Sequence, residues 1–250
     1  MVQKAVVMAG GNANRLKPLT TATNKHMLPV YDRPMIQRVI ETIVASGITE
    51  ILVLLNNTFA QPVMQLLEHG DAFECNITYA YERGVCDVGN RIARAKNFVG
   101  SEPFLLMLGD SFYLNPLRLA PHLRYPHMWV MPLGPAFDDF TKYAEVQLSD
   151  DRTQVVSITE KPVVQRSGII QTGAWVFGAE VCDVAGRLSR EGGQEVQVRT
   201  LVRHYLDTAK MWATMIPPQS FLDLGTIEAL HKGGVLAKEA RKAASLTAAE

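Results

Sequence analysis

Short apolar segments alternate with helical patterns through residues 4–108, and this alternation constrains the fold more than any other feature of the chain. The segments predict strands at 4–8, 50–55, 77–81 and 103–108, and helices at 34–46, 61–69 and 92–98. Parallel strands need crossover connections, which are usually helices. The order therefore favours an α/β fold with a mostly parallel sheet and helices on both of its faces.

The pattern changes after Asp110. The later segments predict strands at 129–132, 144–148, 155–159 and 172–177, and only two further helices, at 196–206 and 226–244. The chain has no internal repeat and no low-complexity linker. We therefore expect one domain, residues 1–235, followed by a helical tail at 236–250 that is rich in alanine, lysine and glutamate.

The segment MAGGNANRLKPL, residues 8–19, places two glycines directly behind the first predicted strand. Gly10 and Gly11 allow a sharp turn and a close approach to a ligand, and successive backbone N–H groups there can bind phosphate. Arg15 adds a permanent, forked positive charge that suits phosphate oxygens. An ordinary strand-to-helix turn has the same residues, so this segment alone leaves both interpretations open.

Two aspartates stand at the ends of apolar segments. Asp110 follows FLLMLG, and Asp223 lies in FLDLGT before a glycine. Each is expected to be either a helix cap or a metal ligand. Two carboxylates from remote segments can share one Mg²⁺, which prefers one or two carboxylates together with substrate phosphates.

Two lysines have a comparable ambiguity. Lys25 lies in NKHMLPV and Lys161 in TEKP. Each is expected by default to be a solvated lysine. Together with Arg15, however, they would neutralise a triphosphate and a phosphomonoester, which is the main catalytic device in phosphoryl chemistry.

The composition excludes several classes of partner. Lysine and arginine number 25, aspartate and glutamate also number 25, and the formal net charge is zero. Nucleic acids and anionic membranes are held mainly through positive charge, so we expect neither. The three cysteines lack paired metal spacing, and neither a signal peptide nor an apolar run of about 20 residues is present. We therefore expect a cytoplasmic protein with reduced thiols.

Taken in order, these segments resemble the sugar-1-phosphate nucleotidyltransferases, most closely the glucose-1-phosphate thymidylyltransferase group. The resemblance extends from residue 4 to about residue 230. It rests on AGGNANRL (9–16), PLT (18–20), KHMLPV (25–30), RPMI (33–36), LGDS (108–111), EKP (160–162), TG (172–173) and DLGT (223–226). It implies a three-layer αβα, Rossmann-like fold with a mixed, mostly parallel sheet, a nucleotide-binding first half, an acceptor-binding second half and a homo-oligomer.

The resemblance also implies roles for individual residues. Those expected to bind the nucleoside triphosphate are Ala9, Gly10, Gly11, Asn12, Ala13, Asn14, Arg15, Glu82 and Gly109. Those expected to act in catalysis are Arg15, Lys25, Asp110 and Lys161. Asp110 and Asp223 would hold Mg²⁺. The acceptor would contact Glu160, Lys161 and Gly173.

The chain departs from the family pattern at several positions. Ala13 stands where the family usually has a third glycine, and Ser111 where asparagine is common. The segment ERGVCDVGNRIARA, residues 82–95, does not follow the usual Gln-x-x-Pro-x-Gly-Leu-Ala run. Within it, Glu82 stands where thymidylyl and uridylyl enzymes carry a glutamine that contacts the pyrimidine.

The substitution at Glu82 carries a prediction about the base. An ionised glutamate has no hydrogen-bond donor, so it suits an amino group better than a carbonyl. We expect CTP or GTP to be preferred over dTTP and UTP. The alternative is a thymidylyl or uridylyl enzyme in which Glu82 does not contact the base.

The sequence thus predicts a Mg²⁺-dependent enzyme that transfers a nucleotidyl group from a nucleoside triphosphate to a sugar 1-phosphate or similar phosphomonoester. Pyrophosphate and a nucleotide sugar would be the products. A non-catalytic, nucleotide-sugar-binding relative is the main alternative. Ala13 and the altered segment at 82–95 favour it, whereas the complete set of charged residues opposes it. A dinucleotide-binding dehydrogenase fits less well, because no G-x-G-x-x-G follows the first strand.

Overall fold

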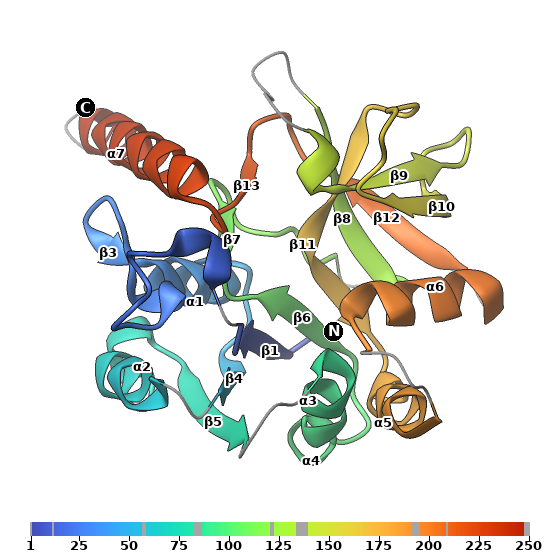
Figure 1. The fold of residues 1–250 in the computed structure, drawn as a ribbon, viewed down its shortest axis with the longest axis horizontal. Coiled ribbons are helices and arrows are strands. Elements are labelled where there is room, and N and C mark those ends of the chain that lie inside the picture. The colour runs from blue at the N-terminus through green and yellow to red at the C-terminus, as the bar shows by residue number, and fades with distance from the viewer. Residues whose placement is uncertain are drawn as a thin grey trace.

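The computed structural model describes residues 2–11, 13–56, 59–82, 87–120, 123–133, 140–191, 196–208 and 210–247 (Figure 1). The strands are β1 (Lys4–Ala9), β2 (Pro29–Val30), β3 (Arg33–Pro34), β4 (Glu50–Asn56), β5 (Asn76–Glu82), β6 (Phe104–Leu108), β7 (Ser111–Tyr113), β8 (His127–Pro132), β9 (Ala144–Leu148), β10 (Gln154–Glu160), β11 (Ile169–Phe177), β12 (Met211–Met215) and β13 (Phe221–Asp223). The helices are α1 (Met35–Ala45), α2 (Ala60–Leu67), α3 (Val88–Arg94), α4 (Lys96–Val99), α5 (Val181–Glu191), α6 (Val198–Thr208) and α7 (Ile227–Thr247).

The strands and helices predicted for the first half are confirmed, with one change. The predicted helix at 92–98 is two shorter helices, α3 and α4, which meet at Ala95. In the second half, the sequence pattern missed helix α5. Its buried stripe consists mainly of small residues, Ala185 and Gly186 next to Val181 and Cys182, and such a stripe gives a weak apolar pattern.

Nine strands form one sheet in the order β5-β4-β1-β6-β11-β8-β12-β10-β9. The first four strands are parallel to one another, as the alternation of strands and helices predicts. Beyond β6 the expectation of a mostly parallel sheet is wrong. Strand β11 is antiparallel to β6 and β8, β10 is antiparallel to β9 and β12, and only β12 and β8 run parallel. The antiparallel neighbours β9 and β10 are joined by the short turn at 149–153, with no helical crossover.

The two faces of the sheet have separate apolar cores. Alternate residues of a strand point to opposite faces, so Val7 of β1 packs in one core with α1 and α2, and Val6 packs in the other with α3, α5 and α6. Figure 1 shows these two sets of helices apart from each other around the sheet. The expected helices on both faces are therefore present.

A third apolar cluster joins helix α7 to the segment after the glycine turn. Leu230 and Ala237 of α7 pack near Leu16 and Val30 in this cluster. Helix α7 continues without interruption past residue 236, where the sequence pattern placed the start of a tail, and Ala237 is buried. No helix in the described part of the chain is both long and apolar enough to span a membrane.

Candidate active site

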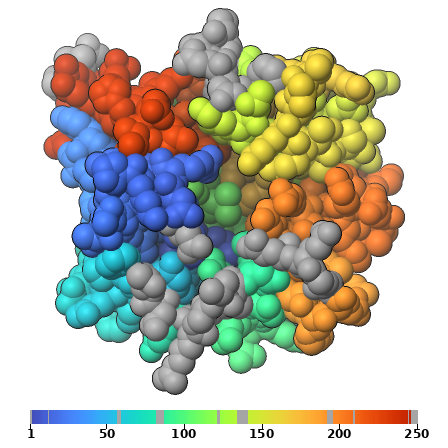
Figure 2. Space-filling view, in the orientation of Figure 1, coloured from blue at the N-terminus to red at the C-terminus, as the bar shows by residue number. Residues whose placement is uncertain are grey.

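The carboxyl ends of the parallel strands β1 and β6 lie side by side at the centre of the molecule. Met8 pairs with Leu108, and the backbone N–H of Gly109 donates to the carbonyl of Met8 at 3.0 Å. The glycine turn after β1 and Asp110 after β6 therefore leave the sheet together. Figure 2 shows a hollow in this face, between the blue N-terminal segments and the yellow and orange later segments, with green residues on its floor.

Asp110 forms a close ion pair with Lys25. The distance from Lys25 Nζ to Asp110 Oδ2 is 2.6 Å, and only 14% and 13% of the two side chains are exposed. Burial by itself would raise the pKa of Asp110, but the positive charge of Lys25 outweighs it, and the pKa lies below its ordinary value. Asp110 is therefore ionised at neutral pH.

The second predicted metal ligand, Asp223, lies next to Asp110. Strands β7 and β13 are antiparallel, with Asp223 opposite Ser111, and the N–H of Leu224 donates to the Asp110 carbonyl at 3.0 Å. Burial, and then the negative charge of Asp110, raise the pKa of Asp223 to about 6. Two segments 113 positions apart in sequence, residues 110 and 223, thus bring two mutually repelling carboxylates together.

The charge balance of these carboxylates fits a divalent cation. Arg15 lies 3.8 Å from Asp223, between Arg15 Nη2 and Asp223 Oδ2, but Arg15 is mostly exposed and the pair is weak. Lys25 forms its ion pair with Asp110, and its charge opposes the raised pKa of Asp223 only in part. A hard cation such as Mg²⁺ accepts two carboxylate ligands and completes its shell with water and phosphate oxygens. No group of three or more histidine, cysteine or acidic side chains is close enough to ligate a metal within the described ranges.

The glycine turn lies directly beside this pair. A Cβ added to Gly11 would lie 3.5 Å from Lys25 Nζ, so the backbone of Gly11 faces the lysine. Ala13 has φ 51° and ψ 32°, the left-handed conformation for which glycine is best suited. The Thr20 hydroxyl donates to the Ala13 carbonyl at 3.0 Å and so fixes the turn.

Two other glycines allow close packing around the site. A Cβ on Gly109 would lie 2.8 Å from the ring of His26, which is fully buried. A Cβ on Gly173 would lie only 1.9 Å from Ser111 Oγ, and this hydroxyl donates to the Gly173 carbonyl at 3.4 Å. The departure at Ser111 therefore has a structural role, since it joins Asp110 to strand β11.

The predicted acceptor residues are placed less tightly. Gly173 contacts Ser111 and so borders the carboxylates. Glu160 ends strand β10 and forms a long ion pair, 3.8 Å, with Arg199 of α6. Lys161 follows with a left-handed φ of 44°. Within the described ranges it has no hydrogen bond or ion pair, and the structure does not join it to Asp110 or Asp223.

The structure describes some of the remaining predicted nucleotide ligands and not others. Ala9 ends β1, and Asn14 and Arg15 begin a short 3₁₀ helix, Asn14–Leu16. Asn12 lies outside the described residues. Glu82 ends strand β5 beside Asn56 of β4, but its side chain also lies outside what the structure describes.

Sequence reasoning missed two residues that contact the turn. The Asn56 side chain donates through Nδ2 to the Gly10 carbonyl at 3.3 Å. Arg91 of α3 also reaches Gly10, because a Cβ there would lie 2.8 Å from Arg91 Nη1. Asn56 directly follows the predicted strand at 50–55, and this position could have marked it as a candidate for the site. Arg91 had no such sequence signal, because its contact with Gly10 depends on how α3 packs in the fold.

A third missed residue, Asn24, orients the segment that carries Lys25. Its Oδ1 accepts from the His26 N–H at 3.0 Å and lies 2.6 Å from His26 Nδ1, which fixes the start of the short helix that carries Lys25. Burial lowers the pKa of His26 to about 3, so the imidazole is neutral. An asparagine before a helical segment is a typical cap, and the sequence therefore contained this signal.

The fold and the site define an α/β enzyme that handles phosphate groups, with a glycine turn, two carboxylates and two cations at adjacent strand ends. A family model described as nucleotidyl transferase matches residues 4–239. A glucose-1-phosphate thymidylyltransferase of Xanthomonas campestris is 30% identical over 237 residues, covering 92% of this chain and 79% of the relative. One from an Actinoplanes species is 30% identical over 227 residues, covering 90% and 74%.

Solved structures agree on the fold. A structure described as a glucose-1-phosphate thymidylyltransferase from Bacillus anthracis superposes with a TM-score of 0.84, 22% identity and 95% coverage of both chains. A UDP-glucose pyrophosphorylase in complex with UDP-glucose superposes with a TM-score of 0.74 and 16% identity, covering 96% of this chain and 99% of the other. The chain belongs to the nucleotidyl transferase family, as a sugar-1-phosphate nucleotidyltransferase.

Proposed function

We propose that this chain joins a nucleoside triphosphate to a sugar 1-phosphate in a Mg²⁺-dependent reaction that releases pyrophosphate. The observation that carries the proposal is the pair Asp110 and Asp223. Asp110 directly precedes β7, and Asp223 ends the adjacent antiparallel strand β13. Lys25 forms a close ion pair with Asp110 at 2.6 Å, and Arg15 forms a weaker one with Asp223 at 3.8 Å.

The chemistry requires two anions to meet. A phosphate oxygen of the sugar 1-phosphate attacks the α-phosphorus in line, and the bond from that phosphorus to the pyrophosphate oxygen breaks. Mg²⁺ held by Asp110 and Asp223 would supply positive charge to the phosphoryl oxygens. No protein nucleophile is needed, because positioning and charge stabilisation account for most catalysis in this class of reaction.

The residues of the chain have separate tasks in this scheme. The backbone of Gly10 and Gly11 holds the triphosphate, and Arg15 stabilises the leaving pyrophosphate. Lys25 lies against both the turn and Asp110, and these contacts support a role for it at the reacting phosphates. Lys161, the exposed lysine at the end of β10, binds the phosphate of the acceptor.

For the two substrates, the relatives' names favour dTTP and glucose 1-phosphate, and we propose these. This choice adopts the alternative in which Glu82 does not contact the base. CTP or GTP is the second candidate, and the observation that favours it is the glutamate at position 82, which has no donor for a thymine carbonyl.

A pyrophosphate-release screen tests the proposal. The five substrates dTTP, UTP, CTP, GTP and ATP are each combined with glucose 1-phosphate and other sugar phosphates, with and without Mg²⁺. We expect release only with both substrates and metal, and most with dTTP. Preference for CTP or GTP, lost in Glu82→Gln, would support the second candidate. Tight nucleotide-sugar binding with no release for any pair would support the non-catalytic alternative and refute the proposal.

A further inference from the structure

The guanidinium group of Arg91 lies against Gly10 of the glycine turn, whereas Lys25 lies against Gly11. A Cβ on Gly10 would lie 2.8 Å from Arg91 Nη1 and 3.0 Å from Arg91 Cζ. The backbone of Asn56, at the end of β4, borders the same position at 3.2 Å. Arg91 is half-buried, and it therefore forms part of the wall beside the turn.

Helix α3, which carries Arg91, is held firmly in place. The Asp87 carboxylate accepts from the Asn90 N–H at 2.7 Å, from Ser189 Oγ at 3.1 Å and from the Val196 N–H at 3.1 Å. These contacts tie the start of α3 to α5 and to the segment before α6.

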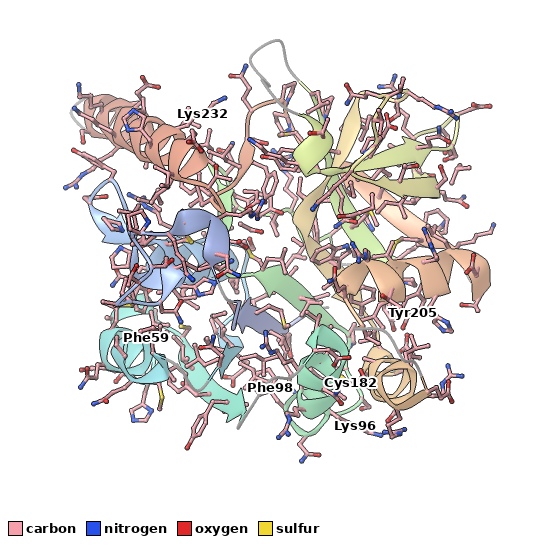
Figure 3. All side chains as sticks on the ribbon, in the orientation of Figure 1. Phe59, Lys96, Phe98, Cys182, Tyr205 and Lys232 are labelled. Atoms are coloured by element: carbon pink, nitrogen blue, oxygen red, sulfur yellow. The ribbon has the colours of Figure 1, made fainter. Side chains whose placement is uncertain are left out.

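Close packing fixes α3 further. A Cβ on Gly89 would lie 2.3 Å from Ser189 Oγ, so the helices approach as closely as a glycine allows. Figure 3 labels Lys96 and Phe98 on α4 and Cys182 on α5, in the region where α3, α4 and α5 lie together, and Lys96 forms an ion pair with Asp183 of α5. Arg91 is thus presented by a rigid support, which favours a defined contact.

The two sides of the turn face different parts of a bound nucleotide. Gly11 faces Lys25 and the carboxylates, where the proposed function places the reacting phosphates. Gly10 faces Arg91 and the ends of β4 and β5, where Asn56 pairs with Glu82. In the binding mode that we infer, the phosphates lie toward Lys25, and the ribose and base extend along the other side of the turn toward Arg91.

We propose that Arg91 contacts the base of the bound nucleotide and selects bases with a carbonyl oxygen at O4 of thymine and uracil or O6 of guanine, where cytosine and adenine have an amino group. Arginine is a donor only, with a planar fork that suits the oxygen of thymine or uracil and the O6 and N7 atoms of guanine. At the amino group of cytosine or adenine, the arginine would meet another hydrogen-bond donor and could form no hydrogen bond with it. The inference rests on the proposed function for the direction in which the nucleotide lies, and it extends that function by naming the residue that selects the base.

Binding of individual nucleotides tests the proposal. The dissociation constants of dTTP, UTP, GTP, CTP and ATP are measured by calorimetry for the wild type, for Arg91→Met and for Arg94→Met. Methionine keeps an apolar stem against Gly10, and Arg94 is an exposed arginine of the same helix. We expect the wild type to bind dTTP, UTP and GTP about 10-fold or more tightly than CTP and ATP. Arg91→Met should remove most of that difference, and Arg94→Met should leave it unchanged.

Two results would overturn the proposal. One is an equal loss for all five nucleotides in Arg91→Met, which would assign the contact to a phosphate. The other is an unchanged preference. If Arg91→Met does not fold, as judged by thermal unfolding, Arg91→Lys replaces it. That variant should retain less preference than the wild type, because lysine lacks the fork, and an undiminished preference refutes the contact. A wild type that discriminates among the bases but releases no pyrophosphate would refute the proposed function and leave the role of Arg91 standing.

Discussion

Asp110 and Asp223 differ in what their charges contribute to the folded state. The ionised form of Asp223 is disfavoured by burial and by Asp110, with a pKa of about 6. Asp223→Asn removes that repulsion, so we expect the metal-free variant to be more stable than the wild type by about 1–3 kcal/mol at pH 8. Its turnover should nevertheless fall by about 100-fold or more, because metal charge stabilisation is worth several kcal/mol. Thermal unfolding in a chelator and pyrophosphate release measure the two effects, and a variant that is both less stable and fully active would contradict this account.

Asp110→Asn is expected to behave differently. Turnover should again fall by about 100-fold or more. Here, however, Lys25 loses its partner at a largely buried position, so the variant should also be destabilised, by about 3 kcal/mol on the scale for broken buried pairs. From the sequence alone we would expect folding to be almost unaffected, since nothing there shows that Asp110 is paired with Lys25. Thermal unfolding of Asp110→Asn beside Asp223→Asn gives opposite signs if the pairing is as described.

Ala13 carries a separate prediction, about backbone strain. A non-glycine residue in the left-handed conformation costs about 1 kcal/mol, and Ala13 has φ 51°. Ala13→Gly should therefore raise stability by about 0.5–1 kcal/mol. The matched control is Ala9→Gly, in the middle of the parallel sheet, which should lower stability by about 0.5–1 kcal/mol. Equal and negative shifts in the two melting temperatures would rule out strain at Ala13.

At the scale of elements, strands β8 and β12 are joined by a histidine that is neutral in the fold. His127 Nε2 lies 3.0 Å from Thr214 Oγ1, and burial lowers the pKa of His127 to about 4. The unfolded chain, with a histidine pKa near 6.5, binds the proton more readily between pH 6.5 and 4. Stability should therefore fall as the pH falls through that window, by about 2 kcal/mol from this residue at pH 4.5. His127→Asn should flatten the dependence measured by denaturant unfolding, and an unaltered slope would show that His127 does not cause it.

The helices and strands also show how much of the fold the apolar pattern of the sequence predicts. Continuous apolar runs predicted β1, β4 and β6 and the parallel half of the sheet, because such runs are buried on both faces. The mixed half was not predictable in the same way, since 60 positions, 109–168, separate β6 from its partner β11 and no local signal encodes that pairing. Helix α5 was missed because its buried stripe is made of small residues.

The site can also be divided into residues that local sequence signals predict and residues whose contacts depend on long-range packing. The glycine turn, Asp110 and Asp223 stand at recognisable strand ends, and the structure brings them together. Asn24 stands before a helical segment, where asparagine is a typical cap, so its contact had a sequence signal. The contact of Arg91 depends on how α3 packs and has no such signal. Lys161 was predicted from its position after a strand, and its role stays a prediction.

At the scale of the whole molecule, the sheet divides into a parallel half and a mixed half. Strand β1 of the parallel half leads into the glycine turn, and strand β10 of the mixed half leads into Lys161. Arg15 and Lys161 belong to different halves, so their loss should affect different substrates. We expect Arg15→Ala to raise mainly the KM for the nucleoside triphosphate, and Lys161→Ala to raise mainly the KM for the sugar phosphate. Steady-state kinetics with each substrate varied in turn gives both values. Equal damage to the two KM values in both variants would show that the halves do not divide the substrates. The expectations of a homo-oligomer, of a cytoplasmic location and of no nucleic-acid partner stay predictions.

The central claim is that Asp110 and Asp223 form one metal site at which a nucleotidyl group is transferred. The most direct measurement is the rate of pyrophosphate release from dTTP and glucose 1-phosphate as Mg²⁺ is titrated, in the wild type and in Asp223→Asn. We predict a saturable rise with Mg²⁺ in the wild type, and in Asp223→Asn a rate lower by about 100-fold or more that saturates, if at all, at a higher Mg²⁺ concentration. A wild-type rate that is unchanged in a chelator, or the same Mg²⁺ titration curve in the two proteins, would contradict the claim.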